Sequence, residues 1–222
     1  MSRNQVLLGI VVLALIALGV AAWYVMGGGS STDTTLTTAG GGGVGITADD
    51  RTLGDPKAKI VAIEYAAPMC PHCAHFNETG IPDLKANYID KGKVFYVFRV
   101  FPIGNPDIGA ESLARCLPAD NYFAFIDQLY RNQANWDPEY GVQDAEAGLV
   151  AQARIAGLSG DQATACMHDK ARNDRVLAVA KDAETKFGIS GTPTFVINGE
   201  VQTAGAQWPE IKAKLDSLLA KK

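Results

Sequence analysis

The chain has 222 residues, of which 47% are hydrophobic and 20% are charged, and its formal net charge is −4 at pH 7. This composition is ordinary for one globular domain with some additional sequence. The slightly acidic balance gives no indication of a nucleic-acid partner, because such proteins usually carry a basic patch.

The N-terminal segment is apolar, and no charged residue lies between Val6 and Met26. This run is longer than the h-region of a cleavable signal peptide, about 7 to 15 residues, and it reaches the length of about 20 residues that crosses a bilayer. Arg3 precedes it, which favours a cytoplasmic N-terminus. We therefore expect residues 1–26 to form a signal anchor, a single transmembrane helix with the rest of the chain exported. A cleaved signal peptide is the alternative.

Residues 27–49 consist mostly of Gly, Ser, Thr and Ala. Such a segment cannot bury enough apolar surface to fold, so we expect a flexible linker. The folded part should begin near residue 50, and it is long enough to bury one substantial core.

The first predicted elements after the linker form a βαβ unit. Residues 60–65 are apolar and partly β-branched, which predicts a short buried strand containing one carboxylate, Glu64. A helix should begin at Pro71 and resume after a kink near residues 80–82. Residues 94–101 predict a second buried strand, and a helix between two strands implies that the strands run parallel.

From residue 104 to residue 187 the strand signals stop, and apolar residues recur at helical spacing. This block is interrupted by Pro118, Pro138, Gly148 and the stretch from Gly157 to Gly160. The pattern predicts several helices packed as an inserted subdomain.

Mixed structure returns after the helical block. Residues 194–197 predict a strand, Asn198-Gly199 predicts a two-residue hairpin turn, and residues 201–204 predict the returning strand. The chain should end in a helix whose apolar face carries Trp208, Ile211, Leu215 and Leu218.

Two cysteines stand three positions apart in Cys70-Pro71-His72-Cys73, at the junction of the first predicted strand and helix. Pro71 suits the first turn of a helix, so Cys70 should lie at the helix N-terminus, where free backbone N–H groups and the helix dipole favour a thiolate. A protonated His72 would add to this effect, so Cys70 is the predicted reactive thiol. Cys73, one turn further into the helix, should be more covered and should attack a mixed disulfide formed on Cys70.

The same stretch is compatible with a metal site. Its two cysteines and two histidines lie close enough in sequence to suggest zinc: Cys70, His72, Cys73 and His75. Structural zinc sites usually bring a second pair of ligands at matching spacing, and the other two cysteines do not form such a pair. We therefore predict a redox-active dithiol with no metal and no cofactor.

Four features of the sequence together resemble the DsbA-like thiol:disulfide oxidoreductases of the thioredoxin fold. They are Glu64 ahead of the first cysteine, the Pro-His dipeptide between the cysteines, the helical block before the third main strand, and Gly191-Thr192-Pro193-Thr194. The resemblance covers about residues 53–222. It implies an α/β thioredoxin-fold domain, preceded by the transmembrane helix, with an inserted helical domain. In residue ranges, we predict the thioredoxin-fold domain at 50–103 and 188–222, and the inserted helical subdomain at 104–187.

The resemblance also implies roles for residues outside the Cys-Pro-His-Cys motif. It places a cis peptide bond at Thr192-Pro193 facing the cysteines, where a proline that opens a strand leaves an edge able to pair with an extended substrate. A trans proline is the alternative. It implies that Glu64 exchanges a proton with Cys73, because burial in an apolar strand would raise the pKa of this carboxylate. A solvated carboxylate at a sheet edge is the alternative.

Cys116 and Cys166 both fall in the helical block. In an exported domain they would tend to be joined, so we predict a structural disulfide that clamps the insertion. Closing a loop of this length is worth on the order of 4 kcal/mol in the chain-entropy model. Free thiols acting as secondary redox sites are the alternative.

These expectations combine into one functional hypothesis. The chain would be a monomeric thiol:disulfide oxidoreductase, tethered by one helix in a bacterial inner membrane with its catalytic domain in the periplasm or otherwise outside the cytoplasmic membrane. It would introduce disulfides into exported proteins that carry free thiols, and by resemblance a quinone-linked membrane protein would reoxidise it. A disulfide reductase or isomerase is the alternative within the same chemistry, which Thr192 keeps open. A non-enzymatic copper or zinc chaperone is the alternative outside it.

Overall fold

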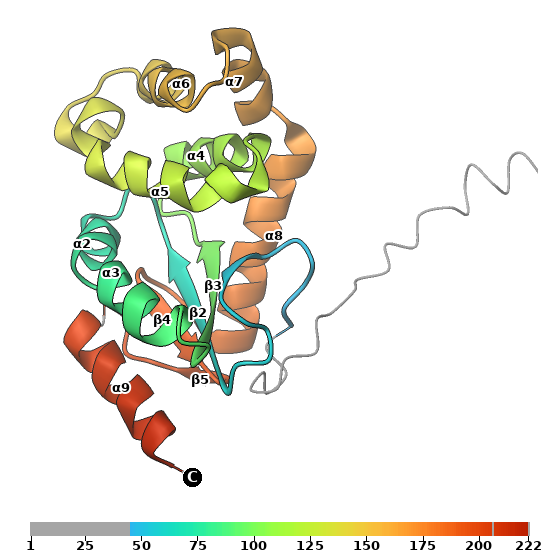
Figure 1. Ribbon diagram of the computed structural model, residues 1–222. Helices are drawn as coiled ribbons and strands as arrows, with labels where there is room; N and C mark the ends of the chain where they lie inside the picture. The colour runs from blue at the N-terminus through green and yellow to red at the C-terminus, as the bar shows by residue number, and fades with distance from the viewer. Residues whose placement is uncertain (1–44, 206, 222) are drawn as a thin grey trace, which may run out of the picture. The chain divides into compact units, whose positions relative to one another are not determined.

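The structure is a computed structural model that describes residues 45–205 and 207–221 (Figure 1). The predicted signal anchor and most of the predicted linker lie outside these residues. Within the described part of the chain, no helix combines the length and the apolar character needed to cross a membrane. The anchor at residues 1–26 therefore stays a prediction.

The described elements alternate as the sequence patterns indicate, with a long helical stretch between two strand regions. The strands are β1 (Arg51–Leu53), β2 (Ile60–Ala66), β3 (Val94–Val100), β4 (Thr194–Ile197) and β5 (Glu200–Val201). The helices are α2 (Pro71–Thr79), α3 (Ile81–Leu84), α4 (Asn105–Cys116), α5 (Tyr122–Arg131), α6 (Ala145–Ile155), α7 (Gly160–Met167), α8 (Lys170–Phe187) and α9 (Trp208–Ala220). Short helical turns are a π-helix, η1 (Lys85–Ile89), and the 3-10 turns η2 (Ala119–Asn121), η3 (Gln133–Asn135) and η4 (Pro138–Tyr140).

The five strands form one mixed sheet in the order β1-β3-β2-β4-β5. β2 and β3 run parallel, as the βαβ pattern predicted, and β4 pairs antiparallel with β2. The hairpin between β4 and β5 turns at Asn198 and Gly199, which have φ values of 50° and 84°, as a primed turn requires. Strand β1 was not predicted: it pairs antiparallel with β3 and is too short to show a pattern of alternation.

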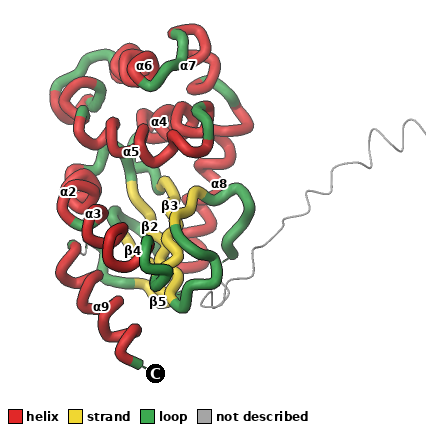
Figure 2. Tube along the Cα trace, in the orientation of Figure 1, coloured by secondary structure: helices red, strands yellow, loops and turns green. Residues whose placement is uncertain are grey.

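Helices cover both faces of this sheet (Figures 1 and 2). Alternate residues of β2 point to opposite faces, so Ala62 and Ala66 join the core that also contains Cys73 and residues of α9, whereas Val61 and Ile63 join the core beneath α8. Glu64 lies two residues from Ala62 and from Ala66 in β2 and therefore lies on the same face of the sheet. The central strand therefore points its one carboxylate toward the face that carries the cysteines.

Helices α4 to α8, with the turns between them, form the helical insertion between β3 and β4. Cys116 at the end of α4 and Cys166 in α7 are joined by a disulfide bond, with their Cα atoms 6.2 Å apart. The prediction of a break at Gly148 was wrong, because Gly148 lies inside α6. A Cβ at this position would lie 2.6 Å from the Cα of Trp136, so the glycine permits close packing of α6 on the preceding turn.

Candidate active site

Cys70 is the N-cap of α2. Pro71 occupies the first helical position, and the Cys70 Sγ accepts a hydrogen bond from the backbone N–H of Cys73 at 3.4 Å. The first intrahelical bond runs from the Ala74 N–H to the Cys70 carbonyl at 3.0 Å. The sulfur thus lies where the unpaired N–H groups of the helix start converge.

The surroundings of Cys70 lower the pKa of its thiol to about 6. The largest cause is a hydrogen bond from the Cys73 thiol, and burial opposes it; smaller lowering contributions come from the Thr192 side chain and from the backbone N–H groups of Cys73 and His72. At pH 7 a thiol with this pKa is present mostly as the thiolate, about ten to one.

Cys73 lies one turn further along α2 and is fully buried. Burial, followed by the hydrogen bond to Cys70 and by the charges of Cys70 and Glu64, raises the pKa of the Cys73 thiol well above its ordinary value. The two sulfurs therefore differ strongly: Cys70 is the acidic thiol, and Cys73 stays protonated at neutral pH.

The His72 side chain is exposed on α2, and so is Pro71. Among the described residues, no hydrogen bond or ion pair is found between the His72 imidazole and Cys70. The contribution of His72 to the lowered pKa of Cys70 comes from its backbone N–H. The expected role of the imidazole as a thiolate stabiliser therefore stays a prediction.

The Thr192-Pro193 peptide bond is cis, and the loop that carries it faces Cys70. In the thiol form the Cys70 Sγ donates to the Thr192 carbonyl oxygen at 3.5 Å. Pro193 is buried directly ahead of β4, and its own carbonyl accepts from the Gly205 N–H at 2.7 Å. The Pro193 carbonyl is thus already occupied. The backbone groups that lie beside the Cys70 sulfur are those of Thr192.

Glu64 is 3% exposed in the central strand. Burial raises the pKa of its carboxyl to about 7, a hydrogen bond from Tyr96 opposes this rise, and the charge of Cys70 adds to it. The Tyr96 hydroxyl donates to the Glu64 carboxylate at 2.5 Å. Arg99, also in β3, instead pairs with Asp50, so among the described residues no cation pairs with Glu64.

Replacing Tyr96 with phenylalanine is expected to raise the pKa of Glu64 further, by about one pH unit. The hydroxyl of Tyr96 stabilises the ionised carboxylate, and the variant lacks this hydrogen bond. At pH 7 the carboxyl would then be mostly protonated. The measurement is a ¹³C NMR titration of the Glu64 carboxyl. Tyr122→Phe is the matched control, since the Tyr122 hydroxyl also donates to a buried carboxylate, that of Glu111, at 2.5 Å. An unchanged Glu64 midpoint in Tyr96→Phe would contradict the expectation.

Two tyrosines near the cysteines were not predicted from the sequence. Tyr96 comes from β3, and Tyr130 comes from α5 of the helical insertion. The Tyr130 hydroxyl is buried without a hydrogen-bond partner among the described residues, and after burial the charges of Cys73 and Glu64 raise its pKa most. Only knowledge of the strand register and of the packing of the insertion could have found them.

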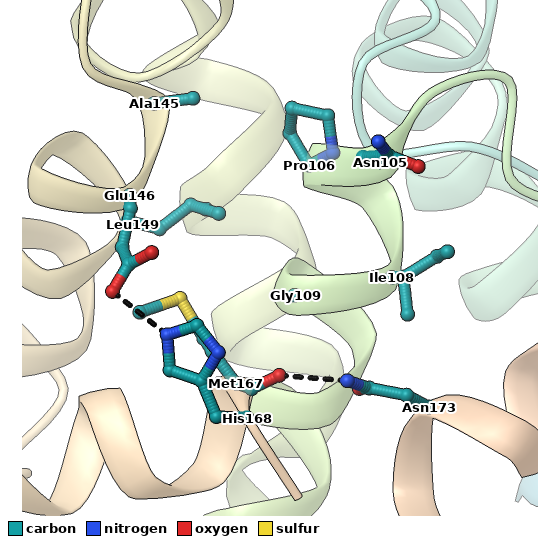
Figure 3. A pocket seen from close by; sticks show the side chains of 10 residues that line it. All are labelled: Asn105, Pro106, Ile108, Gly109, Ala145, Glu146, Leu149, Met167, His168 and Asn173. Atoms are coloured by element: carbon teal, nitrogen blue, oxygen red, sulfur yellow. Dashed lines mark hydrogen bonds and ion pairs between the residues drawn. The ribbon is translucent and has the colours of Figure 1, made fainter. Parts of the chain in front are cut away.

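Hollows of similar size lie beside α2 and within the insertion. The groove beside α2 measures about 470 Å³ and is lined by residues that include Pro71, His75, Tyr130 and Gln133. Figure 3 shows a more apolar cavity of about 420 Å³ between α4, α6 and α7, with Leu149 and Met167 in its wall. The second cavity contains none of the predicted site residues. In the described ranges no cluster of three or more metal-ligating side chains is present.

The sequence of this chain is similar to those of known proteins. A sequence profile of the family described as Thioredoxin matches residues 47–217. A Rickettsia bellii chain named as a candidate protein-disulfide oxidoreductase is 32% identical over 175 residues, covering 78% of this chain and 66% of the relative. A Bacillus cereus chain named as a candidate disulfide bond formation protein D is 29% identical and is covered to 79%, with 77% of this chain matched.

Solved structures are also similar. The crystal structure of Wolbachia pipientis α-DsbA1 superimposes with a TM-score of 0.71 at 30% sequence identity, covering 79% of this chain and 94% of that one. The match covers 66% of the Rickettsia bellii relative and 61% of the Rickettsia conorii relative, so this chain spans less than two thirds of their length.

Proposed function

Because this chain belongs to the DsbA-like thiol:disulfide oxidoreductases of the thioredoxin fold, we propose that it oxidises dithiols in exported proteins through the Cys70–Cys73 pair. The observation that carries the proposal is the position of Cys70, at the start of α2 and facing the Thr192 carbonyl. Cys70 is 4% exposed and Cys73 is fully buried, so an exchange partner would meet the Cys70 sulfur first, and Cys73 lies behind it in the helix.

The oxidising direction follows from the thiolate at Cys70. With a pKa of about 6, the reduced pair gains stability from ionisation at every pH above 6, whereas the disulfide has no group to ionise. The reduced state is therefore favoured at neutral pH, and electrons flow from substrate thiols to the pair. This advantage disappears as the pH falls through 6, because the thiol is then protonated in the folded protein as well.

The first step is attack of a substrate thiolate on the Cys70 sulfur of the disulfide. The substrate–Cys70 bond forms, the Cys70–Cys73 bond breaks, and its electron pair goes to Cys73. Burial makes a Cys73 thiolate unfavourable, so this sulfur needs a proton as it leaves. Glu64, whose pKa of about 7 keeps part of it protonated at neutral pH, is the group we assign as donor.

The second step releases the product. A second substrate thiolate attacks the substrate sulfur of the mixed disulfide, the substrate disulfide forms, and Cys70 leaves as a stabilised thiolate. Its low pKa makes Cys70 a good leaving group. An extended substrate backbone would lie along the Thr192 peptide, since the neighbouring Pro193 carbonyl is already bonded within the chain.

The setting of this reaction is part of the same proposal. A signal anchor at residues 1–26 and a flexible linker that begins at residue 27 would hold the domain outside the cytoplasmic membrane, within reach of a quinone-linked membrane partner that reoxidises the dithiol. The prediction that the linker extends to residue 49 was wrong, because Ile46 is 1% exposed and packs in the core. We propose that the domain acts as a monomer. The division into residues 50–103 with 188–222, and residues 104–187, stays a prediction.

Equilibration with glutathione redox buffers tests the direction of the reaction. We expect a reduction potential well above the roughly −270 mV of thioredoxin, together with rapid oxidation of a dithiol peptide by the disulfide form. The redox state is read by alkylation and mass spectrometry. A potential close to that of thioredoxin would reject the oxidase and favour the reductase or isomerase alternative.

A further inference from the structure

The link between β2 and α2 is a tight turn. The Cys70 N–H bonds to the Ala67 carbonyl at 3.0 Å, which makes Pro68 and Met69 the two central residues of the turn. The peptide group between these two residues takes no part in that hydrogen bond. The common turn types I and II differ mainly by a flip of this central peptide, so the turn's own hydrogen bond does not determine its orientation.

Two side chains of the helical insertion bind the central peptide. The Met69 N–H donates to Asp107 Oδ1 at 2.8 Å, and the Pro68 carbonyl accepts from Gln133 Nε2 at 2.8 Å. The N–H and C=O of a trans peptide point in opposite directions, so the two side chains hold the peptide from opposite sides. Asp107 is fully buried and Gln133 is 5% exposed.

Both side chains are themselves oriented. Asp107 Oδ2 accepts from the backbone N–H groups of Ile103 and Gly104, at 2.9 and 3.2 Å, where α4 begins. The Tyr140 hydroxyl donates to Gln133 Oε1 at 3.2 Å, which leaves the Gln133 amide nitrogen directed at the Pro68 carbonyl. In a flipped peptide the carbonyl oxygen would face the Asp107 carboxylate and the N–H would face an amide N–H, so this pair of side chains disfavours the flip.

We propose that Asp107 and Gln133 are positioning residues that hold the Pro68–Met69 peptide in one orientation and thereby keep the Cys70 sulfur at the start of α2. The Cys70 sulfur accepts from the Cys73 backbone N–H at 3.4 Å, and this distance leaves little room for displacement before the bond to a thiolate weakens. The helical insertion thus contributes to thiolate stabilisation although it supplies no reacting atom. This inference rests on the proposed function and assigns residues to it.

The test uses Gln133→Met and Asp107→Asn in the full chain. Gln133→Met keeps nearly the same size and removes the donor to Pro68. Asp107→Asn removes the negative charge that faces the Met69 N–H and two further N–H groups. Thiolate absorbance at 240 nm, as the difference between dithiol and disulfide forms, follows Cys70 across pH. We expect its midpoint to rise by about one pH unit in each variant, and the equilibrium constant with glutathione at pH 7 to change about fivefold.

Two control variants remove comparable buried bonds elsewhere in the insertion. Gln152→Met removes the acceptor of the Gln128 amide at 2.9 Å, and Glu111→Gln removes the charge of a buried α4 carboxylate that accepts from the Tyr122 hydroxyl at 2.5 Å. Both should lower the melting temperature while leaving the Cys70 midpoint at its wild-type value. If Gln133→Met does not fold, Gln133→Leu replaces it, because leucine is also uncharged and cannot donate to the Pro68 carbonyl.

Variants of Asp107 and Gln133 that lose stability like the controls but keep the wild-type Cys70 midpoint would overturn the proposal, since the two residues would then be only structural. Failure of the proposed function looks different. In that case the wild-type chain would not oxidise dithiols, while the displacement of the Cys70 midpoint between wild type and variants would still be measurable.

Discussion

Replacing Cys70 with serine is expected to reduce dithiol oxidation to the uncatalysed background, whereas Cys73→Ser should yield a protein that accumulates mixed disulfides. The difference follows from the two environments. Cys70 is the acidic thiol at the helix N-cap and is the less buried of the two, 4% exposed against 0% for Cys73. Cys73 is buried behind it and serves to resolve the bond on Cys70. A serine hydroxyl at position 73 cannot attack that bond.

The measurement is incubation of each variant with a substrate disulfide, followed by non-reducing electrophoresis and mass spectrometry. Cys73→Ser retains a hydroxyl that can donate to Cys70, whereas Cys73→Ala removes the hydrogen bond that lowers the pKa of Cys70 most. The alanine variant should therefore trap adducts more slowly near pH 6, with the pH midpoint of trapping displaced upward. Equal inactivity of both serine variants, without adducts, would count against the assigned roles.

Removal of the Cys116–Cys166 bridge should lower the free energy of unfolding by about 4 kcal/mol, because the bond closes a separation of 50 residues in the unfolded chain. For a domain of this size the loss corresponds to a fall in melting temperature of about 10 °C. The bridge joins α4 to α7. Among the described residues, neither of its cysteines forms a hydrogen bond with Cys70 or Cys73. The double variant Cys116→Ala/Cys166→Ala should therefore keep oxidising dithiols at 25 °C.

Urea unfolding of the wild type and the double variant, both in the Cys70–Cys73 disulfide form, measures this effect without reduction of the active pair. The single variant Cys116→Ala should lose about as much stability as the double variant, since one cysteine alone cannot close the loop. Identical unfolding midpoints would show that the bridge does not form in solution. A folded double variant that has lost dithiol oxidation would instead support the alternative in which these cysteines take part in redox chemistry.

Local patterns in the sequence predict the parts of the site that lie close together in the chain. Pro71 marks the helix start, so Cys70 could be placed at the N-cap and Cys73 one turn further in. The apolar neighbours of Glu64 indicated a buried carboxylate, and burial does raise its pKa. The loop at Thr192 and Pro193 came from family resemblance, because nothing in its local composition locates it beside a sulfur more than a hundred residues away.

Other parts of the site depend on pairing between distant segments. The hydrogen bond between Tyr96 and Glu64 depends on the register of β2 against β3. This register pairs Tyr96 with Ala62, which lies on the same face of β2 as Glu64 and two residues before it. The two bonds to the Pro68–Met69 peptide join it to residues separated in sequence by 65 and 38 positions. Gly148 locally favours a break but lies inside α6, at a position where a Cβ would come within 2.6 Å of the Trp136 Cα.

The sequence by itself determined the dithiol motif, the βαβ unit, the hairpin at Asn198-Gly199 and the helical character of the insertion, because each depends on spacing within one or two turns or strands. Only the tertiary structure decided which side chains surround the sulfurs. Burial, strand register and the docking of α4 and η3 on the turn before Cys70 are set by packing of the whole domain. Burial and the hydrogen bonds that this packing brings together shift the pKa values of Cys70 and Glu64, on which the chemistry depends.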